Sequence, residues 1–142
     1  MSYFVRNQEF AFGIDLSRYN ASADLTQKPD FGLIAAHQPR VSFIAIRSGV
    51  SWGYRDPMFA VFSRQALAIG ACVMPYHVLY PGESALKQMN NFLRILEGID
   101  LDSVRLALDV ELEHGQTRAV ITNTLLSALE LLEQETGRLP IV

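Results

Sequence analysis

Two acidic residues, Asp109 and Glu111, have the type and spacing needed for acid-base chemistry. They end the segment 104–111, which alternates apolar residues with small or polar ones, as expected for a strand with one buried face. Because side chains alternate faces along a strand, both carboxylates would project from the other face. Two neighbouring carboxylates repel each other when both are ionised, so the pair tends to divide into one acid and one base. Hydrolysis of a glycosidic bond uses such a pair, although an exposed strand end rich in acids would show the same pattern.

A third acidic residue, Asp15, ends a segment of the same design. Residues 9–17 alternate large apolar side chains with small ones, and Asp15 lies among the small ones. A salt-bridged strand end is the alternative interpretation. The repetition of the layout favours a shared role for Asp15 and the first two acids.

Three further candidates lie near the carboxyl ends of two other predicted strands, 41–48 and 71–78. Arg47 either lines a site or neutralises a nearby acid. Tyr76 and His77 form a pair that can line a pocket, although a single histidine at a strand end is more often simply hydrogen-bonded. In the loop after the first of these strands, Trp52 and Tyr54 offer stacking surfaces for a sugar or cover the end of the sheet.

The elements that must position these residues alternate along the chain. Pro75 within the strand 71–78 lacks a backbone donor, which predicts a bulge or an early strand end there. The alternation of strands and helices predicts an α/β fold with parallel strands and crossover helices, whose functional residues gather at the carboxyl ends of the strands. The predicted strands are 9–17, 41–48, 71–78, 104–111 and 139–142, and the predicted helices are 29–37, 57–69, 83–97 and 117–136.

Composition limits the function classes. A chain of 142 residues that is 49% hydrophobic suits one domain with its own core, and its net charge of −3 argues against nucleic-acid binding. No stretch reaches transmembrane length, and the amino terminus lacks the apolar core of a secretory signal. The single cysteine, Cys72, excludes an intrachain disulfide and is expected to be a small buried side chain. His37, His77 and His114 are scattered, so we expect no metal site and no cofactor.

Four motifs, taken in order, resemble those of the glycoside hydrolase family 25 lysozymes, which are N-acetylmuramidases. The family's first strand resembles GIDLSRYN at residues 13–20, and its helix start resembles DPMF at residues 56–59. A further family segment is similar to MPYHVLYP at residues 74–81, and its acidic strand is similar to DVE at residues 109–111. Together these motifs cover nearly the whole chain.

This resemblance implies a (β/α) barrel-like fold with parallel strands, and hydrolysis of the β-1,4 bond between N-acetylmuramic acid and N-acetylglucosamine in peptidoglycan. Glu111 would be the general acid. Asp109 would stabilise the developing positive charge or position the acetamido group of the substrate, and Asp15 would complete the acidic cluster. Tyr76 would line a sugar subsite, with Arg47 and His77 as further substrate-binding candidates.

The resemblance also has departures. The segment RSGVS at residues 47–51 lacks the glutamate usual in the family, and Asn20-Ala21 replaces a Gln-Gly pair. The family's later strands, with a tryptophan-rich stretch and a late aspartate, have no counterpart here. We therefore expect residues 1–142 to form a single domain with an incomplete barrel of about five strands and four helices, lacking the last strands.

The expected partner is the glycan strand of peptidoglycan, with no nucleic acid and no membrane insertion, and with a second copy if the partial barrel is the native chain. The expected site of action is the cell wall, reached from outside or by release from a phage-infected cell. The alternative is a non-catalytic wall-binding or scaffold domain that retains the fold, and whether these 142 residues act alone is left open. An unrelated flavodoxin-like module would need a phosphate-binding glycine loop after the first strand, and residues 17–20 are not one.

Overall fold

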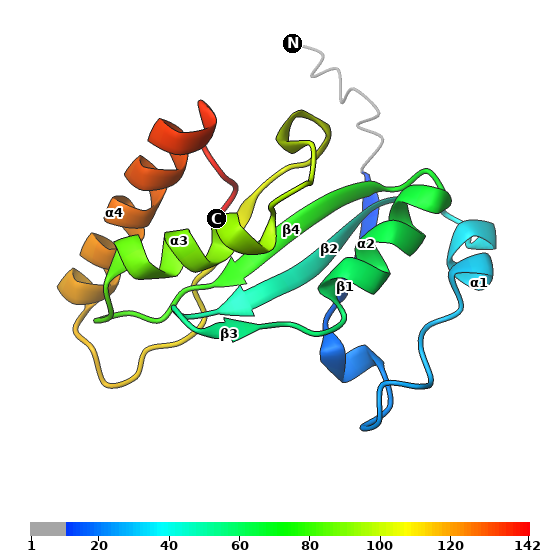
Figure 1. Cartoon of the computed structure of the whole chain (residues 1–142), viewed down its shortest axis with the longest axis horizontal. Helices are drawn as coiled ribbons and strands as arrows, with labels where there is room; N and C mark the ends of the chain where they lie inside the picture. The colour runs from blue at the N-terminus through cyan, green and yellow to red at the C-terminus, as the bar shows by residue number, and fades with distance from the viewer. Residues whose placement is uncertain (1–10) are drawn as a thin grey trace, which may run out of the picture.

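A parallel sheet with helices packed along it forms the framework of the molecule (Figure 1). The computed structural model describes residues 11–142. The strands are β1 (Phe12–Leu16), β2 (Val41–Val50), β3 (Tyr54–Arg55), β4 (Cys72–Val78) and β5 (Ala107–Asp109). The α-helices are α1 (Phe31–Ala36), α2 (Phe59–Ala68), α3 (Ala85–Ile95) and α4 (Arg118–Thr136), and short 3-10 helices span Arg18–Asn20 and Leu101–Ser103.

The strand order is β1-β2-β4-β5, and each of these neighbours pairs in parallel. Beyond β5, an isolated parallel bridge joins Ala107 to Ile141, in the segment predicted as the last strand. The α/β class, the parallel strands and the four helices are therefore confirmed. The two-residue strand β3, which pairs antiparallel with the end of β2, was not predicted.

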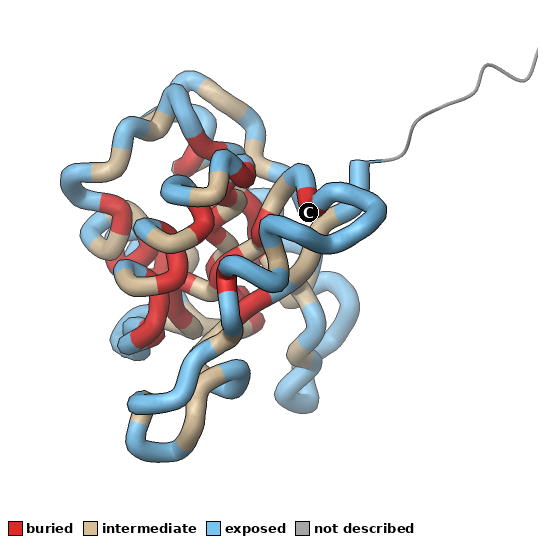
Figure 2. Tube along the Cα trace, turned by 90° about the vertical axis from the view of Figure 1, so that its right-hand side faces the viewer, coloured by how far each residue is buried: buried red, intermediate tan, exposed pale blue. Residues whose placement is uncertain are grey.

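The core lies between the sheet and the helices α2 and α3, which Figure 1 shows in front of the strands. Ile44 and Ile46 of β2 have no exposed surface, and neither do Phe62 of α2 and Phe92 of α3. Figure 2 shows the buried segments at the centre, with exposed segments around them. This burial fixes which face of each strand points away from the helices, and that second face carries the candidate site.

The helix boundaries follow the predicted capping residues. The Asp30 carboxylate accepts hydrogen bonds from the backbone N–H groups of Gly32 and Leu33 at 2.8 and 3.2 Å, and so caps α1. The Thr117 hydroxyl accepts from the N–H of Val120 at 3.3 Å and caps α4. Gly137 ends α4 with a φ of 69°, a left-handed conformation that favours glycine.

The strand predicted over 104–111 is shorter than expected, because β5 begins only at Ala107 and because its neighbour β4 ends at Val78, opposite Asp109. The last backbone hydrogen bond between the β4 and β5 segments runs from the Leu79 N–H to the Asp109 carbonyl, at 2.8 Å. Glu111 therefore lies in the loop after β5 rather than in the strand. Cys72, predicted to be buried, is exposed, because it lies on the face of β4 opposite the buried Val73.

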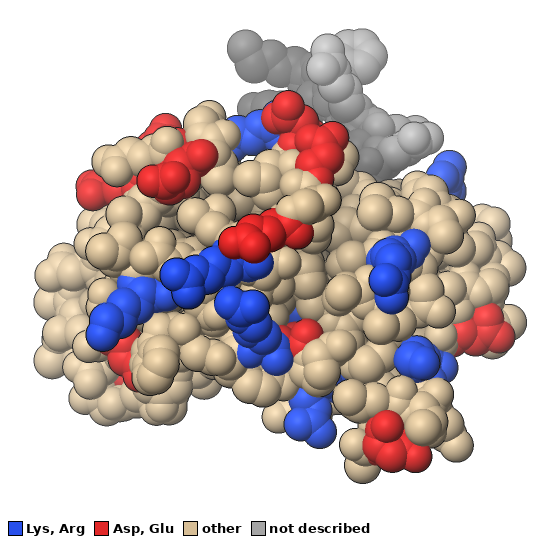
Figure 3. Space-filling model, in the orientation of Figure 1, with Lys and Arg blue, Asp and Glu red and all other residues tan. Residues whose placement is uncertain are grey.

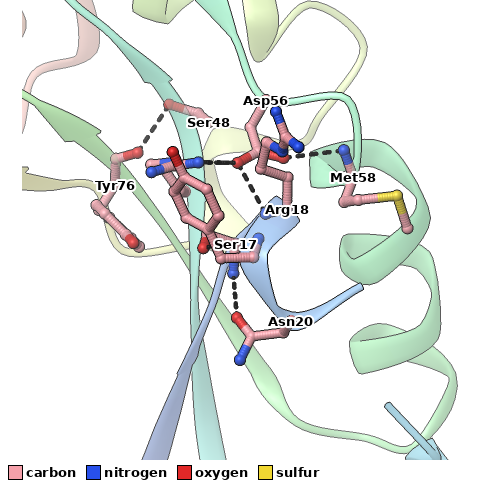
Figure 4. Close-up of polar contacts among 9 residues, drawn as sticks. Ser17, Arg18, Asn20, Ser48, Asp56, Met58 and Tyr76 are labelled. Carbon is pink, nitrogen blue, oxygen red and sulfur yellow. Dashed lines mark hydrogen bonds and ion pairs between the residues drawn. The ribbon is translucent and has the colours of Figure 1, made fainter. Parts of the chain in front are cut away.

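The irregularity predicted around Pro75 occurs in the neighbouring strand. Pro75 is fully buried in β4 and pairs with Ile46 of β2. The register then shifts between Arg47 and Gly49, so that the bulge falls at Ser48. The Ser48 hydroxyl donates to the Tyr76 carbonyl at 2.8 Å, as Figure 4 shows. The bulge thus lies next to the paired residues Arg47 and Tyr76, and the Ser48 hydroxyl links the two strands there.

No helix within residues 11–142 has both the length and the apolar character that crossing a bilayer requires.

Candidate active site

Five of the six predicted site residues come together where the parallel strands end. Strand pairing places Arg47 of β2 beside Tyr76 of β4, and Asp109 at the end of β5 beside the last residue of β4. Asp15 lies one residue before the end of β1, and its charge acts on the Tyr76 hydroxyl. Glu111 follows two residues after β5, and its charge acts on Asp109. The fold thus brings together acids from its two outer strands, β1 and β5, at the carboxyl ends of the strands.

The surroundings of the cluster raise the pKa values of two of its groups, Asp109 and Tyr76. Burial raises the pKa of Asp109, and the negative charges of Glu111 and Asp15 raise it further. Burial also raises the pKa of Tyr76, and the negative charge of Asp15 raises it further. Tyr76 therefore stays neutral at physiological pH. Asp109 holds a proton to a higher pH than an exposed aspartate does.

Three carboxylates that share this environment can perform two tasks in one site. A protonated carboxyl can donate to a leaving oxygen, and the ionised ones can stabilise a positive charge that develops nearby. Among residues 11–142, no three His, Cys, Asp or Glu side chains are placed to hold a metal ion.

Arg47 is held by a buried acid at the edge of this cluster. Its Nε donates to the carboxylate of Asp56 at 2.9 Å, and one of its terminal nitrogens lies 2.9 Å from the same oxygen. The Asp56 side chain has no exposed surface, and it also accepts from the backbone N–H groups of Arg18 and Met58 at 3.0 and 2.9 Å (Figure 4). The open question about Arg47 thus has a structural answer: it neutralises an acid. The sequence predicted Asp56 as the cap of the following helix, but α2 begins at Phe59 with Met58 at its N-cap, and Asp56 accepts from the Met58 N–H in the turn before it.

Aromatic rings border the cluster beside Arg47. The Arg47 guanidinium lies over the rings of Tyr19 and Tyr54, at 4.9 and 5.6 Å from their centroids. Tyr19 is 76% exposed, so its ring is accessible to solvent. Tyr19 was not singled out from the sequence, although it lies in the same short motif as Asp15. These rings offer flat apolar surfaces of the kind on which sugar rings stack.

The loop that carries Glu111 is attached to the segment that follows β4. The Tyr80 hydroxyl and His114 Nδ1 are 2.8 Å apart, and the two rings stack with centroids 3.7 Å apart. His114 lies three residues after Glu111, in the same loop, so this contact limits how far the loop can move. The pair was not predicted, because its members are distant in sequence and neither belongs to a strand.

His77 is the one predicted site residue that the structure does not bring to the cluster. It follows Tyr76 in β4, so its side chain points to the opposite face, where it has no exposed surface. Its Nε2 donates to the Ser51 carbonyl at 2.8 Å, and its ring stacks on Phe92 with centroids 5.3 Å apart. The expectation that His77 contacts substrate is therefore corrected to a role in packing α3 against the sheet.

The buried His77 should make stability depend on pH. Burial lowers its pKa to about 4 from the ordinary value of 6.5. Between these values the unfolded chain binds a proton that the folded chain excludes, so acidification destabilises the fold, by about 3 kcal/mol at pH 4. Urea unfolding of the wild type and of His77→Gln, measured from pH 7 to pH 4, should show a smaller loss of stability in the variant. The exposed His37→Gln is the control and should keep the slope of the wild type; equal slopes in all three would contradict the prediction.

Comparison with known proteins places the chain by both sequence and structure. The family model described as Glycosyl hydrolases family 25 matches residues 14–142. No curated protein sequence matches the chain.

Solved structures share the fold at low sequence identity. A muramidase from Trichobolus zukalii has 22% identity and a TM-score of 0.72, over 90% of this chain and 62% of that one. A family 25 glycosyl hydrolase from Bacillus anthracis has 19% identity and a TM-score of 0.72, over 89% and 56%. The modular autolysin LytC from Streptococcus pneumoniae, in complex with a synthetic peptidoglycan ligand, has 17% identity and a TM-score of 0.67, over 87% and 30%.

At these identities the structural likeness concerns the fold, and the chain spans less than two thirds of the length of each of these proteins. The family assignment rests on the family model, which covers every residue of the acidic cluster. This chain belongs to glycosyl hydrolases family 25.

Proposed function

We propose that the chain forms the acidic face of a peptidoglycan hydrolase that cleaves the β-1,4 bond between N-acetylmuramic acid and N-acetylglucosamine. The convergence of Asp15, Asp109 and Glu111 at the carboxyl ends of the parallel strands is the observation that supports this proposal. Membership of family 25 supports glycoside hydrolysis, and the peptidoglycan ligand of LytC supports the substrate class.

In this proposal each of the three acids has a different role in the reaction. Glu111 is exposed in the loop after β5, where it can reach a leaving oxygen, and it acts as the general acid. Asp109 is half-buried beside it and either stabilises the positive charge of the transition state or positions the acetamido group of the substrate. Asp15 adds negative charge to the same region, close enough to raise the pKa values of both Tyr76 and Asp109.

In the same proposal, Tyr76 and Arg47 help to form the surface on which the sugar binds. The neutral Tyr76 hydroxyl lines the sugar subsite and contacts Asp15 rather than ionising. Arg47 has its charge neutralised by Asp56, so it supports the rings of Tyr19 and Tyr54 without blocking the acids. A sugar ring can then stack on the aromatic border while its glycosidic oxygen faces the carboxylates.

Analysis of the new chain ends tests the proposed bond. Purified peptidoglycan is incubated with the protein, the new reducing ends are reduced with borohydride, and the resulting sugar alcohol is identified. We expect muramitol, because the proposed cleavage leaves N-acetylmuramic acid at the reducing end. Glucosaminitol would show cleavage of the other glycosidic bond, and binding to peptidoglycan without new ends would indicate a non-catalytic wall-binding domain.

A further inference from the structure

A second polar pocket lies on the side of the β2–β3 hairpin that faces α3. It has a volume of about 310 Å³ and is lined by Trp52, Arg55, Lys87, Asn90, Asn91 and Arg94. None of these residues belongs to the acidic cluster, and the proposed reaction uses none of them. The pocket therefore needs an explanation of its own.

Positive charge dominates this pocket. Arg55, Lys87 and Arg94 are all exposed, and none of them forms an ion pair within residues 11–142. Lys87 and Arg94 are seven residues apart on α3, so two helical turns bring them to the same side. Figure 3 shows basic side chains gathered over this part of the surface. An anionic group would meet three cations that form no ion pair with a carboxylate of the described chain.

The walls of the pocket are held together by a buried amide. Asn91 is 5% exposed, and its Nδ2 donates to the carbonyls of Ser51 and Tyr54 at 3.2 and 3.1 Å. Its Oδ1 accepts from Nε of Arg55 at 3.4 Å. These bonds fix the hairpin to α3, so that Arg55 and Trp52 are presented on a rigid wall. Such preorganisation lowers the entropic cost of binding a ligand.

The chemistry of the lining points to a peptide that carries carboxylates. The cations suit free carboxylates, and the exposed amide of Asn90 can pair with a peptide bond. The exposed ring of Trp52 suits small aliphatic side chains. A phosphate polymer would use the cations but would leave the amide and the ring without a matching group.

The hairpin also connects this pocket with the acidic cluster. Tyr54 of β3 lies against the Arg47 guanidinium on one side, and its carbonyl is bound by Asn91 on the other. We propose that this pocket binds the peptide stem of the glycan whose sugar backbone lies in the cleft, through the stem's carboxylates. The inference rests on the proposed function, because it takes the peptide and the glycan from the same polymer.

Binding measurements can test this inference without turnover. Dissociation constants are measured by calorimetry at low salt for two soluble probes, a peptidoglycan disaccharide with its peptide stem and the same disaccharide without it. The wild type should bind the first probe more tightly. The double variant Lys87→Gln/Arg94→Gln should bind the first probe about fivefold to twentyfold more weakly, and the second probe as the wild type does. Lys28→Gln/Arg64→Gln removes the same charge from exposed positions outside the pocket and should bind both probes as the wild type does.

Each contrary result has a distinct meaning. Equal affinity of the wild type for both probes, or equal losses in the two double variants, would overturn the inference. Competition by a teichoic acid but not by the free stem peptide would also overturn it, and would assign the pocket to a phosphate polymer. Failure of the proposed function shows separately, as an absence of new reducing ends, while the free stem peptide still reports on the pocket.

Discussion

Replacing Glu111 with glutamine should lower the rate of peptidoglycan hydrolysis by about two to four orders of magnitude. Glutamine keeps the size of the side chain but has no proton to give to the leaving oxygen. Because Glu111 is exposed and forms no side-chain hydrogen bond within the described residues, the stability of the variant should stay within about 0.5 kcal/mol of the wild type. The measurement is the initial rate of reducing-end release, paired with urea unfolding of each protein.

Glu113→Gln provides a matched control for this prediction. Glu113 lies in the same loop and is exposed, and the substitution removes the same charge. Its rate should stay within about twofold of the wild type, because Glu113 is not among the charges that act on Asp109. A wild-type rate in Glu111→Gln would exclude Glu111 as the acid. In that case the pair would be acting through Asp109, whose pKa is raised by burial.

The sequence was sufficient to predict the acidic cluster because two general rules combine there. Alternation along a strand separates one face from the other, and parallel strands bring their carboxyl ends to a common edge. Asp15 and Asp109 each lie at such an end, so their proximity follows from the strand assignment alone. Only the position of Glu111 differs, because β5 stops when its neighbour does.

The faces of β4 could not be predicted in the same way. The run CVMPYHV is apolar on both faces, and a strand covered on both faces gives no periodic signal to separate them. His77 was therefore grouped with Tyr76, and Cys72 was expected to be buried. Both assignments depend on which face the helices cover, and only the packing of Phe92 and Phe62 against the sheet decides this.

Contacts that involve loops could not be predicted from the sequence either. The pairing of β3 with β2, the bond from Arg47 to Asp56 and the contact of Tyr80 with His114 each involve a loop residue or a strand of only two residues. Each depends on loop geometry that follows from the assembled sheet. These contacts orient the site, whereas the alternation of strands and helices decides only where it lies.

The largest effect on stability is expected at Asp56. Asp56→Asn keeps the shape of the side chain but removes its charge, and the Arg47 side chain is then left 12% exposed without its partner. Breaking one half of a buried ion pair costs about 3 to 5 kcal/mol, and the lower end applies here because Arg47 retains some contact with solvent and with the rings of Tyr19 and Tyr54. Urea unfolding at neutral pH, compared with the wild type, measures this loss.

The pair of Asp102 with Arg138 provides the matched control, because its aspartate is 85% exposed on its side chain. Asp102→Asn makes the same chemical change and should cost less than about 1 kcal/mol, since water screens an exposed pair. Similar losses in the two variants would show that burial does not strengthen the pair at Asp56. In Asp56→Asn, Arg47 is also free to turn toward Asp15 and Asp109, so hydrolysis should slow beyond what unfolding explains. This excess should persist when rates are compared at temperatures where both proteins are folded.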